Sequence, residues 1–192
     1  DLKLPEAESE AKFLKDAFTA TAVEPHSKSV TDLLRTGEFD LLHFACHGYA
    51  EQDDISNAGL LMQGRIENGE YKEDCLTSSE AEQNRNPGGP DQNRPMVVLN
   101  ACQVGRAAYK LTGIGGFATA FITGNAGAFI GTLWSVGDSP ARTFTETFYS
   151  ELLKGSRIAN AAITAREAAR EKGDATWLAY VVYGNPQAVV TR

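Results

Sequence analysis

The sequence has few cysteines and a shortage of basic residues, and each shortage excludes a class of protein. Only three cysteines, Cys46, Cys75 and Cys102, occur among its 192 residues. This odd number, without a closely spaced pair, excludes a disulfide-stapled fold and favours a reducing, cytoplasmic compartment. Lysine and arginine total 18 against 25 aspartates and glutamates, which gives a net charge of -7. Neither nucleic acid nor an anionic membrane is therefore expected as a direct partner.

An uninterrupted apolar run long enough to cross a membrane is also missing. Residues 111–136 carry no charge, but six glycines interrupt them. That pattern predicts a buried helix, a break and a buried strand rather than a membrane span. The chain begins at Asp1, with neither an initiator methionine nor a basic leader. We therefore expect a single domain over residues 1–192 that has been excised from a longer chain.

Hydrophobic residues make up 42% of the chain and charged residues 22%, a balance that supports a packed core and excludes global disorder. Three segments are apolar on both faces, as expected of central parallel strands that are covered on both sides. They alternate with segments in which apolar residues recur at helical spacing. The alternation predicts an α/β fold, with a mostly parallel central sheet flanked by helices in a three-layer sandwich. The strands are Phe39–Ala45, Pro95–Asn100 and Ala126–Leu133, and the main helices are Glu6–Thr19, Ala141–Leu153 and Ile158–Glu171.

Shorter elements are predicted between these. A strand over Gly59–Met62 leads into a hairpin turn near Gly69. Thr77, with Glu80 three residues later, has the signature of a capping box at the start of a short helix. Two further short strands are expected at Ala20–Val23 and Ala188–Val190.

Two chemically reactive side chains follow two of the predicted central strands. His47 and Gly48 come shortly after the strand that ends at Ala45, and Cys102 comes shortly after the strand that ends at Asn100. Sites in parallel sheets form at the carboxyl ends of the strands, so these residues meet if the two strands are neighbours. A histidine beside a cysteine generates the thiolate, which is the nucleophilic form. Backbone N–H groups at Gly48 and Cys102 can then bind an oxyanion.

Each of these residues also has a purely structural interpretation. A cysteine after a buried strand is often a small core residue, and a lone histidine is usually a satisfied polar group. His43, four residues before His47, is expected to pack or to support the site from within the strand rather than to act on a substrate. His43 and Cys46 fall on opposite faces of a strand and no second pair of ligands follows, so zinc is not expected. Cys46 and Cys75 are interpreted as unreactive.

Three ordered motifs resemble the CHAT domain, a caspase-like peptidase module that is related to separase and often attached to tetratricopeptide repeats. They are LLHFACHG (Leu41–Gly48), VVLNACQVG (Val97–Gly105) and GTLWSVGDS (Gly131–Ser139). The opening PEAESEAKFL and the segments Phe148–Ala168 and Tyr180–Pro186 also resemble this family, so the resemblance covers nearly the whole chain.

The resemblance implies a caspase-hemoglobinase fold and a cysteine endopeptidase that hydrolyses peptide bonds through a thioester acyl-enzyme. His47 would be the general base and Cys102 the nucleophile, with the backbone amides of Gly48 and Cys102 as the oxyanion hole. No metal and no organic cofactor is implied. The expected partners are a protein or peptide substrate and a regulatory tetratricopeptide or other domain in the parent chain.

The resemblance also implies candidate residues for the S1 pocket. Asp138 would bind a basic P1 side chain, as acidic residues do in separase and in arginine-directed relatives. The alternative is that Asp138 only caps the helix expected to start near Pro140. Trp134 is expected to form a pocket wall or to be a core aromatic. Asn100 stands where the family commonly has serine, which leaves the floor of the pocket undefined.

Two other functions remain open from the sequence. A catalytically silent caspase-like scaffold could recruit partners, although a scaffold has no need to keep both His47 and Cys102. A small-molecule thiol hydrolase or transferase on a doubly wound sheet would need a phosphate-binding glycine loop after the first strand. The segment FACHGYAEQDD is not such a loop.

Overall fold

The computed structural model describes residues 4–49, 58–89, 92, 94–102, 116–134 and 136–191. Within these ranges six strands form one sheet in the order β3-β2-β1-β4-β5-β6. The strands are β1 (Leu41–Tyr49), β2 (Gly59–Glu67), β3 (Glu70–Thr77), β4 (Met96–Cys102), β5 (Ala128–Thr132) and β6 (Tyr180–Gly184). The helices are α1 (Pro5–Phe18), α2 (Ser27–Thr36), α3 (Ser78–Gln83), α4 (Phe117–Thr123), α5 (Asp138–Leu153), α6 (Ile158–Arg170) and α7 (Thr176–Ala179). No helix in the described ranges is both long and apolar enough to span a bilayer.

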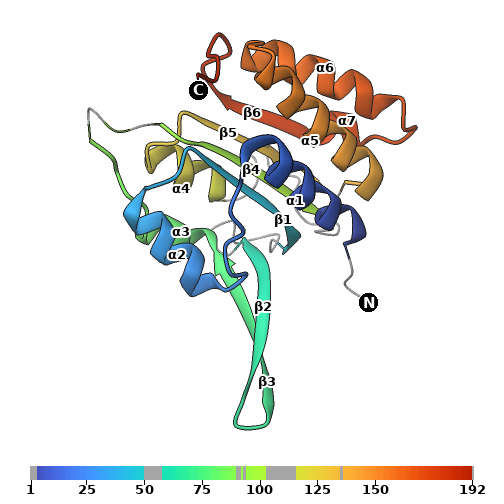
Figure 1. Cartoon of the computed structure of the whole chain (residues 1–192). Helices are drawn as coiled ribbons and strands as arrows, with labels where there is room; N and C mark the ends of the chain where they lie inside the picture. The colour runs from blue at the N-terminus through green and yellow to red at the C-terminus, as the bar shows by residue number, and fades with distance from the viewer. Residues whose placement is uncertain are drawn as a thin grey trace.

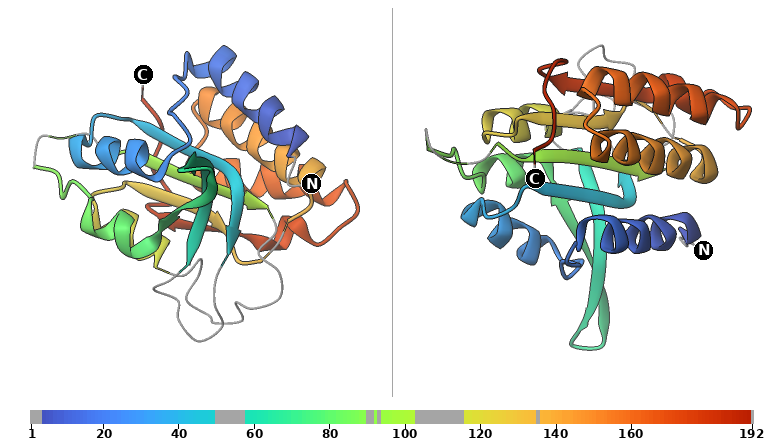
Figure 2. Two further views of the ribbon diagram at one scale, coloured as in Figure 1. Left: turned by 90° about the horizontal axis from the view of Figure 1, so that it is seen from below. Right: turned by 45° about the horizontal axis from the view of Figure 1, so that its top comes forward.

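The three central strands of the sheet run parallel. β1 pairs with β4, and β4 pairs with β5, in parallel. β2 is antiparallel to β1, β3 to β2 and β6 to β5. Helices α1, α5 and α6 cover one face of the sheet, and α2, α3 and α4 cover the other (Figures 1 and 2). The predicted α/β sandwich is confirmed, with parallel strands at its centre and antiparallel strands added towards both edges.

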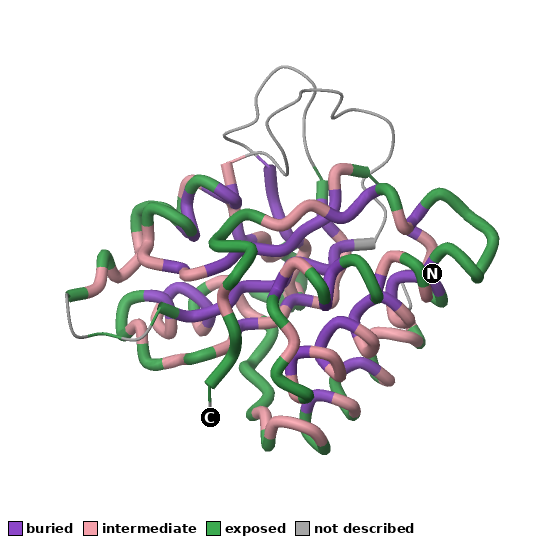
Figure 3. Tube along the Cα trace, turned by 90° about the horizontal axis from the view of Figure 1, so that it is seen from above, coloured by how far each residue is buried: buried purple, intermediate pink, exposed green. Residues whose placement is uncertain are grey.

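A separate hydrophobic core lies on each face of the sheet, because side chains alternate along a buried strand. In β4, Met96 and Val98 belong to the core under α1, α5 and α6, whereas Val97 and Leu99 belong to the core under α2 and α4. Figure 3 shows buried residues running along the strands and on the inner sides of the helices. The central strands are apolar on both faces for this reason.

The β2–β3 hairpin is longer than the sequence pattern predicts and projects from the body of the molecule (Figure 1). Its turn is formed by Asn68 and Gly69 with φ of 53° and 83°, the positive values that a type I′ turn requires. Near the base of the hairpin, Asp74 accepts hydrogen bonds from the N–H (2.8 Å) and the hydroxyl (2.5 Å) of Ser27, the first residue of α2. A side chain from β3 therefore caps α2 and joins the hairpin to the body.

Two predicted short strands, Ala20–Val23 and Ala188–Val190, are not strands in the structure. The first is a mostly exposed connection between α1 and α2. In the second region, the carbonyls of Pro186 and Ala188 accept hydrogen bonds of 3.1 and 2.9 Å from the first turn of α6. The N–H groups of a first helical turn have no acceptor within the helix. The C-terminal segment therefore supplies hydrogen-bond acceptors to α6 rather than adding a strand to the sheet.

Candidate active site

His47 and Cys102 occupy matched positions where the pairing between β1 and β4 ends. The parallel register begins at Leu41 and Met96 and continues to the pair His47 and Cys102. Neighbouring strands lie about 4.8 Å apart, so the backbones of these two residues are adjacent. The sequence predicts that the two residues meet if their strands are neighbours, and the register shows that both residues lie at the same level along those strands.

Strand β1 is longer than predicted, and this changes the setting of His47. The sequence pattern predicts a strand that ends at Ala45, with His47 beyond it, whereas β1 runs to Tyr49. Its last two residues pair with antiparallel β2, which keeps the backbone extended past the end of β4. His47 is half-buried and Gly48 is buried. The histidine is therefore set in regular strand backbone rather than on a loop.

Cys102 is the last residue of β4. The structure describes its place in the strand, and its side chain lies outside the described part of the molecule. The end of the second motif, residues 103–105, and Ser135 of the third motif also lie outside it.

The other two cysteines are poor nucleophiles. Burial, with a smaller contribution from Cys75, raises the pKa of the Cys46 thiol to about 12. Burial also raises the pKa of Cys75, whose Sγ lies 3.0 Å from the hydroxyl of Tyr49. Because only the thiolate is nucleophilic, a raised pKa makes both thiols weaker nucleophiles at neutral pH than an ordinary cysteine. Within the described ranges, no group of three or more His, Cys, Asp or Glu side chains is arranged to hold a metal ion.

A buried polar network lies on the sheet face covered by α1 and α5. Its centre is Glu10 of α1, which is 2% exposed and contacts one side chain from each of two central strands. Oε2 of Glu10 lies 3.0 Å from Nε2 of His43 in β1. Oε1 accepts a hydrogen bond of 2.7 Å from Nδ2 of Asn100 in β4. The network therefore contacts the strand segments that lead to His47 and Cys102.

Three side chains complete the network. The Tyr149 hydroxyl of α5 lies 3.0 Å from Nδ1 of His43, and the Tyr180 hydroxyl of β6 donates to Oδ1 of Asn100 at 2.8 Å. The Thr145 hydroxyl accepts a second hydrogen bond from Nδ2 of Asn100 at 3.3 Å. Burial, followed by a nearby carboxyl group, raises the pKa of Tyr149 well above its usual value, so its hydroxyl stays neutral. In the part of the chain that the structure describes, no buried side-chain nitrogen or oxygen lacks a partner.

Sequence reasoning missed Glu10, although its position carries a signal. Glu10 lies between Ala7 and Leu14 at helical spacing, on the apolar stripe of its helix. A charged residue inside an apolar stripe is costly to bury without a hydrogen-bonded partner. The pattern therefore suggests that a partner exists, but not which one, because His43 and Asn100 are 33 and 90 residues away.

The three candidate S1 residues have different environments. Asp138 is the first residue of α5, whose N-cap is Gly137. The helix thus starts before Pro140, and the alternative of Asp138 as the capping residue is wrong. Trp134 lies on the connection after β5 and is 43% exposed. Asn100 is 2% exposed, and its amide bonds to the three partners described above.

The connection between β5 and α5 is fixed by contacts with α7. The N–H of Leu133 donates to the carbonyl of Ala179 at 2.8 Å, and the N–H of Gly137 donates to the Thr176 hydroxyl at 2.9 Å. A side chain at Gly137 would meet the Asp174 carboxyl group at 2.5 Å, so any larger residue there would displace the Asp174 side chain. The start of α5 is thereby held near the carboxyl ends of the central strands.

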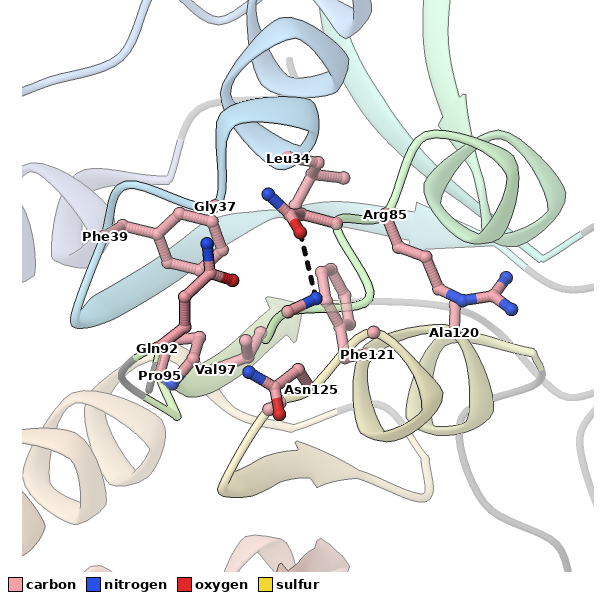
Figure 4. Close-up of a pocket in the computed structure, with 14 residues that line it drawn as sticks. Leu34, Gly37, Phe39, Arg85, Gln92, Pro95, Val97, Ala120, Phe121 and Asn125 are labelled. Atoms are coloured by element: carbon pink, nitrogen blue, oxygen red, sulfur yellow. Dashed lines mark hydrogen bonds between the residues drawn. The ribbon is translucent and has the colours of Figure 1, made fainter. Parts of the chain in front are cut away.

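A surface pocket lies at the other end of the sheet (Figure 4). Phe39 and Pro95, which line it, come shortly before β1 and β4. A hydrogen bond of 3.1 Å from the N–H of Asn86 to the carbonyl of Leu34 crosses one side. Sites in parallel sheets form at the carboxyl ends of strands, so this pocket is separate from the candidate site.

Comparisons with known proteins agree with this architecture. The family model of the CHAT domain matches residues 2–185. A search of curated proteins gave no match. Among solved structures, the Arg-specific cysteine proteinase gingipain R is similar, with a TM-score of 0.58 and 16% sequence identity over 96% of this chain. The present chain spans 42% of that protein, and at this identity the likeness shows the fold alone. Because the family model covers the chain almost from end to end, the chain belongs to the CHAT domain family and has the fold of a caspase-like cysteine proteinase.

Proposed function

We propose that this CHAT domain is a cysteine endopeptidase in which Cys102 is the nucleophile and His47 is the general base. The observation that carries the proposal is the register of β1 and β4, which pairs the two residues where the parallel pairing of these adjacent strands ends. Residues matched across parallel strands share a face of the sheet, and proton exchange needs a thiol and an imidazole within hydrogen-bond reach. Membership of the family and the fold of a cysteine proteinase support the same class of reaction.

The reaction consists of two half-reactions and consumes one water molecule. His47 takes the thiol proton, the thiolate attacks the carbonyl carbon, and the C–N bond breaks as the imidazolium protonates the leaving amine. Water, deprotonated by His47, then attacks the thioester, which releases the carboxylic acid and restores the thiol. We assign stabilisation of the oxyanion to the N–H groups of Gly48 and Cys102. Each such donor typically contributes about 3 kcal/mol to transition-state stabilisation.

A basic P1 side chain is the substrate feature that we propose. Asp138 begins α5 after β5, the strand next to β4, and a carboxylate there complements a guanidinium or an ammonium group. Trp134, which is partly exposed on the same connection, would pack against the aliphatic stem. Gingipain R is itself Arg-specific. We assign Asn100 to the support beneath this pocket, because its amide is bonded within the network.

Substitution of the nucleophile tests the proposal. We expect Cys102→Ala to lower kcat/KM on peptides by about 10⁴-fold or more and to abolish labelling by a peptidyl electrophile. Cys75→Ala is the matched control and should keep both activities, because that thiol is protonated at neutral pH. Circular dichroism checks that each variant is folded. Peptide cleavage by Cys102→Ala at the wild-type rate would contradict the proposal.

Labelling also separates the enzyme from a catalytically silent scaffold. A peptidase that is regulated by an attached tetratricopeptide domain or another partner can be slow on peptides when tested alone. Its Cys102 should nonetheless react with a peptidyl electrophile faster than with a simple alkylating agent at equal concentration. A folded wild-type chain that neither cleaves peptides nor shows this preference would favour the scaffold.

A further inference from the structure

We propose that Glu10 is a positioning residue for the peptidase reaction, and that helix α1 therefore belongs to the catalytic apparatus. The inference rests on the proposed function. Its basis is the carboxyl group of Glu10, which bridges β1 and β4 through His43 and Asn100. These are the two strands on which His47 and Cys102 lie.

Asn100 is the member of the network next to the reacting group. It precedes Cys102 by two residues, a separation of about 6.6 Å along a strand. Its amide is fixed from three directions: Nδ2 donates to Glu10 of α1 and to Thr145 of α5, and Oδ1 accepts from Tyr180 of β6. Cys102 ends its strand, and strand ends open more readily than strand centres. Fixing position 100 therefore limits the movement of the strand end.

His43 extends the same constraint to the other strand. Nε2 of His43 lies 3.0 Å from Glu10, and Nδ1 lies 3.0 Å from the Tyr149 hydroxyl. Both ring nitrogens are bonded, so the ring is fixed between α1 and α5. Because one carboxyl group contacts both strands, a shift of α1 would alter the support of both. Displacement of the reacting atoms by about 1 Å can cost about 100-fold in rate.

Stability alone does not account for this cluster. Replacing a buried polar cluster with well-packed apolar residues of similar volume is often neutral or stabilising. A carboxyl group, an imidazole and an amide instead impose defined directions on one another. The network also lies only on the α1 and α5 side of the sheet, where His43 and Asn100 interrupt otherwise apolar strands.

Substitution of Arg142 is a matched control, because this residue also holds α1 against α5 but forms no hydrogen bond with Glu10. Arg142 of α5 donates a hydrogen bond of 2.9 Å to Glu6 of α1 and one of 2.7 Å to Glu146 of its own helix. Arg142→Ala removes this tie between α1 and α5. It leaves the contacts of Glu10 with β1 and β4 in place.

The decisive readout is the reactivity of Cys102, which needs no peptide substrate. The 192-residue chain is treated with iodoacetamide between pH 5 and pH 9, and alkylation is followed by mass spectrometry. The three cysteines lie in separate tryptic peptides, so the rate at Cys102 is measured without interference. In the wild type, pairing with His47 should put the midpoint of this pH profile below the ordinary thiol value of about 8.5.

We expect Glu10→Ala to shift that midpoint towards about 8.5 and to lower kcat on an Arg-P1 peptide by about 10- to 100-fold. KM should change by less than about two-fold, because Glu10 does not contact the substrate. Arg142→Ala should match the wild type in the Cys102 midpoint, in kcat and in KM. An equal loss in Arg142→Ala would overturn the inference, because general docking of α1 would then explain the effect.

Glu10→Gln tests whether the hydrogen bonds are what matters. The glutamine carbonyl can accept from Asn100, and its amide can donate to Nε2 of His43 if the imidazole proton moves to Nδ1 and bonds to Tyr149. Every contact is then remade, so we expect the wild-type midpoint and a kcat within about three-fold of wild type. A loss as large as that of Glu10→Ala would overturn positioning by hydrogen bonding.

If Glu10→Ala does not fold, Tyr180→Phe tests whether the hydrogen bonds to Asn100 position Cys102. It removes the hydrogen bond to Asn100 but keeps the ring, which stacks on Phe144 with centroids 3.5 Å apart. We expect a fall in kcat of about three- to ten-fold and an upward shift of the Cys102 midpoint. Wild-type values in this folded variant would overturn the inference. A wild-type midpoint already near 8.5 would instead reject the pairing of His47 with Cys102, and with it the proposed function.

Discussion

Asp138 carries the proposed substrate preference, and its charge can be removed without changing its size. Asp138→Asn keeps the first turn of α5 but loses the carboxylate. A charge-assisted hydrogen bond contributes about 1.5–3 kcal/mol, so we expect kcat/KM on Arg-P1 and Lys-P1 peptides to fall by about 10- to 100-fold. Cleavage after uncharged residues should change little. A peptide library that varies only P1 measures both effects.

Ser139→Ala is the control for this experiment, because it changes the next residue of the same helical turn without changing charge. Loss of a negative charge at a helix N-terminus costs about 0.3–1 kcal/mol. Both variants should therefore stay folded, as thermal unfolding will show. A wild-type preference for leucine or aspartate at P1 would reject the assignment, and so would an Asp138→Asn variant that still prefers arginine.

The sequence predicts that His47 and Cys102 lie at the same end of the central strands. Each lies at the end of an apolar segment, and parallel strands expose their carboxyl ends at the same edge. Their support could not be predicted, because Glu10 and Asn100 are 90 residues apart. Which polar side chain meets which depends on how α1 packs against the sheet.

At the scale of the elements, α3 shows how a local signal fixes a boundary. The Thr77 hydroxyl accepts a hydrogen bond of 3.1 Å from the N–H of Glu80, and the Glu80 carboxylate accepts one of 2.8 Å from the N–H of Thr77. We expect Thr77→Ala to lower the free energy of unfolding by about 1 kcal/mol, because an N–H group of the first turn loses its acceptor. Urea denaturation of the variant and the wild type measures the difference.

Glu82→Ala, on the exposed side of the same helix, is the control and should change stability by less than about 0.5 kcal/mol. Reciprocal capping also predicts that the effects of substituting Thr77 and Glu80 are not additive. Thr77→Ala and Glu80→Ala remove halves of one reciprocal arrangement, so the double variant should lose less than the sum of the two single losses. Strict additivity would mean that the two bonds act independently.

Helix boundaries were predicted more accurately than strand lengths, and the reason is physical. The helix predicted over Ile158–Glu171 is α6, Ile158–Arg170. Helix ends depend on local signals, such as Gly37 after α2, whose φ of 66° few other residues adopt readily. The length of a strand depends on its neighbours. β1 extends to Tyr49 because β2 pairs with its end, and Ala20–Val23 is not a strand because no neighbour pairs with it in the described sheet.

At the scale of the whole molecule, the sheet separates two different kinds of core. The core under α2, α3 and α4 is mainly apolar, with isolated buried hydroxyl groups at Thr31 and Ser78, whereas the side under α1 and α5 contains the network around Glu10. The sequence predicts that both faces are covered, because the central strands are apolar throughout. It does not predict the strand order, in which a hairpin from the middle of the chain extends one edge and β6 forms the other.

The connection between that hairpin and the body should make the molecule sensitive to acid. Burial opposes ionisation of Asp74, but hydrogen bonds from the side chain and backbone of Ser27 and from the N–H of Cys75 outweigh it, so the pKa of Asp74 is lowered. A carboxyl group with a lower pKa in the folded state than its ordinary value of 3.8 stabilises the fold above that pH. The contribution is lost as the pH falls through the folded-state value.

We therefore expect Asp74→Asn to be less stable than the wild type by about 1 kcal/mol at pH 7, the upper range for a charge at a helix N-terminus. As the pH falls through the lowered folded-state pKa of Asp74, the two proteins should converge, because both then carry an uncharged group at this position. Urea denaturation at a series of pH values measures the difference. Asp32→Asn is the control: Asp32 pairs with Lys28 and Arg35 at the surface, where ion pairs contribute little, so its difference from wild type should stay small throughout. If the gap between Asp74→Asn and wild type instead stayed constant down to the lowest pH at which both proteins remain folded, the stabilisation would come from a hydrogen bond from Ser27 that the amide cannot accept, and not from the charge.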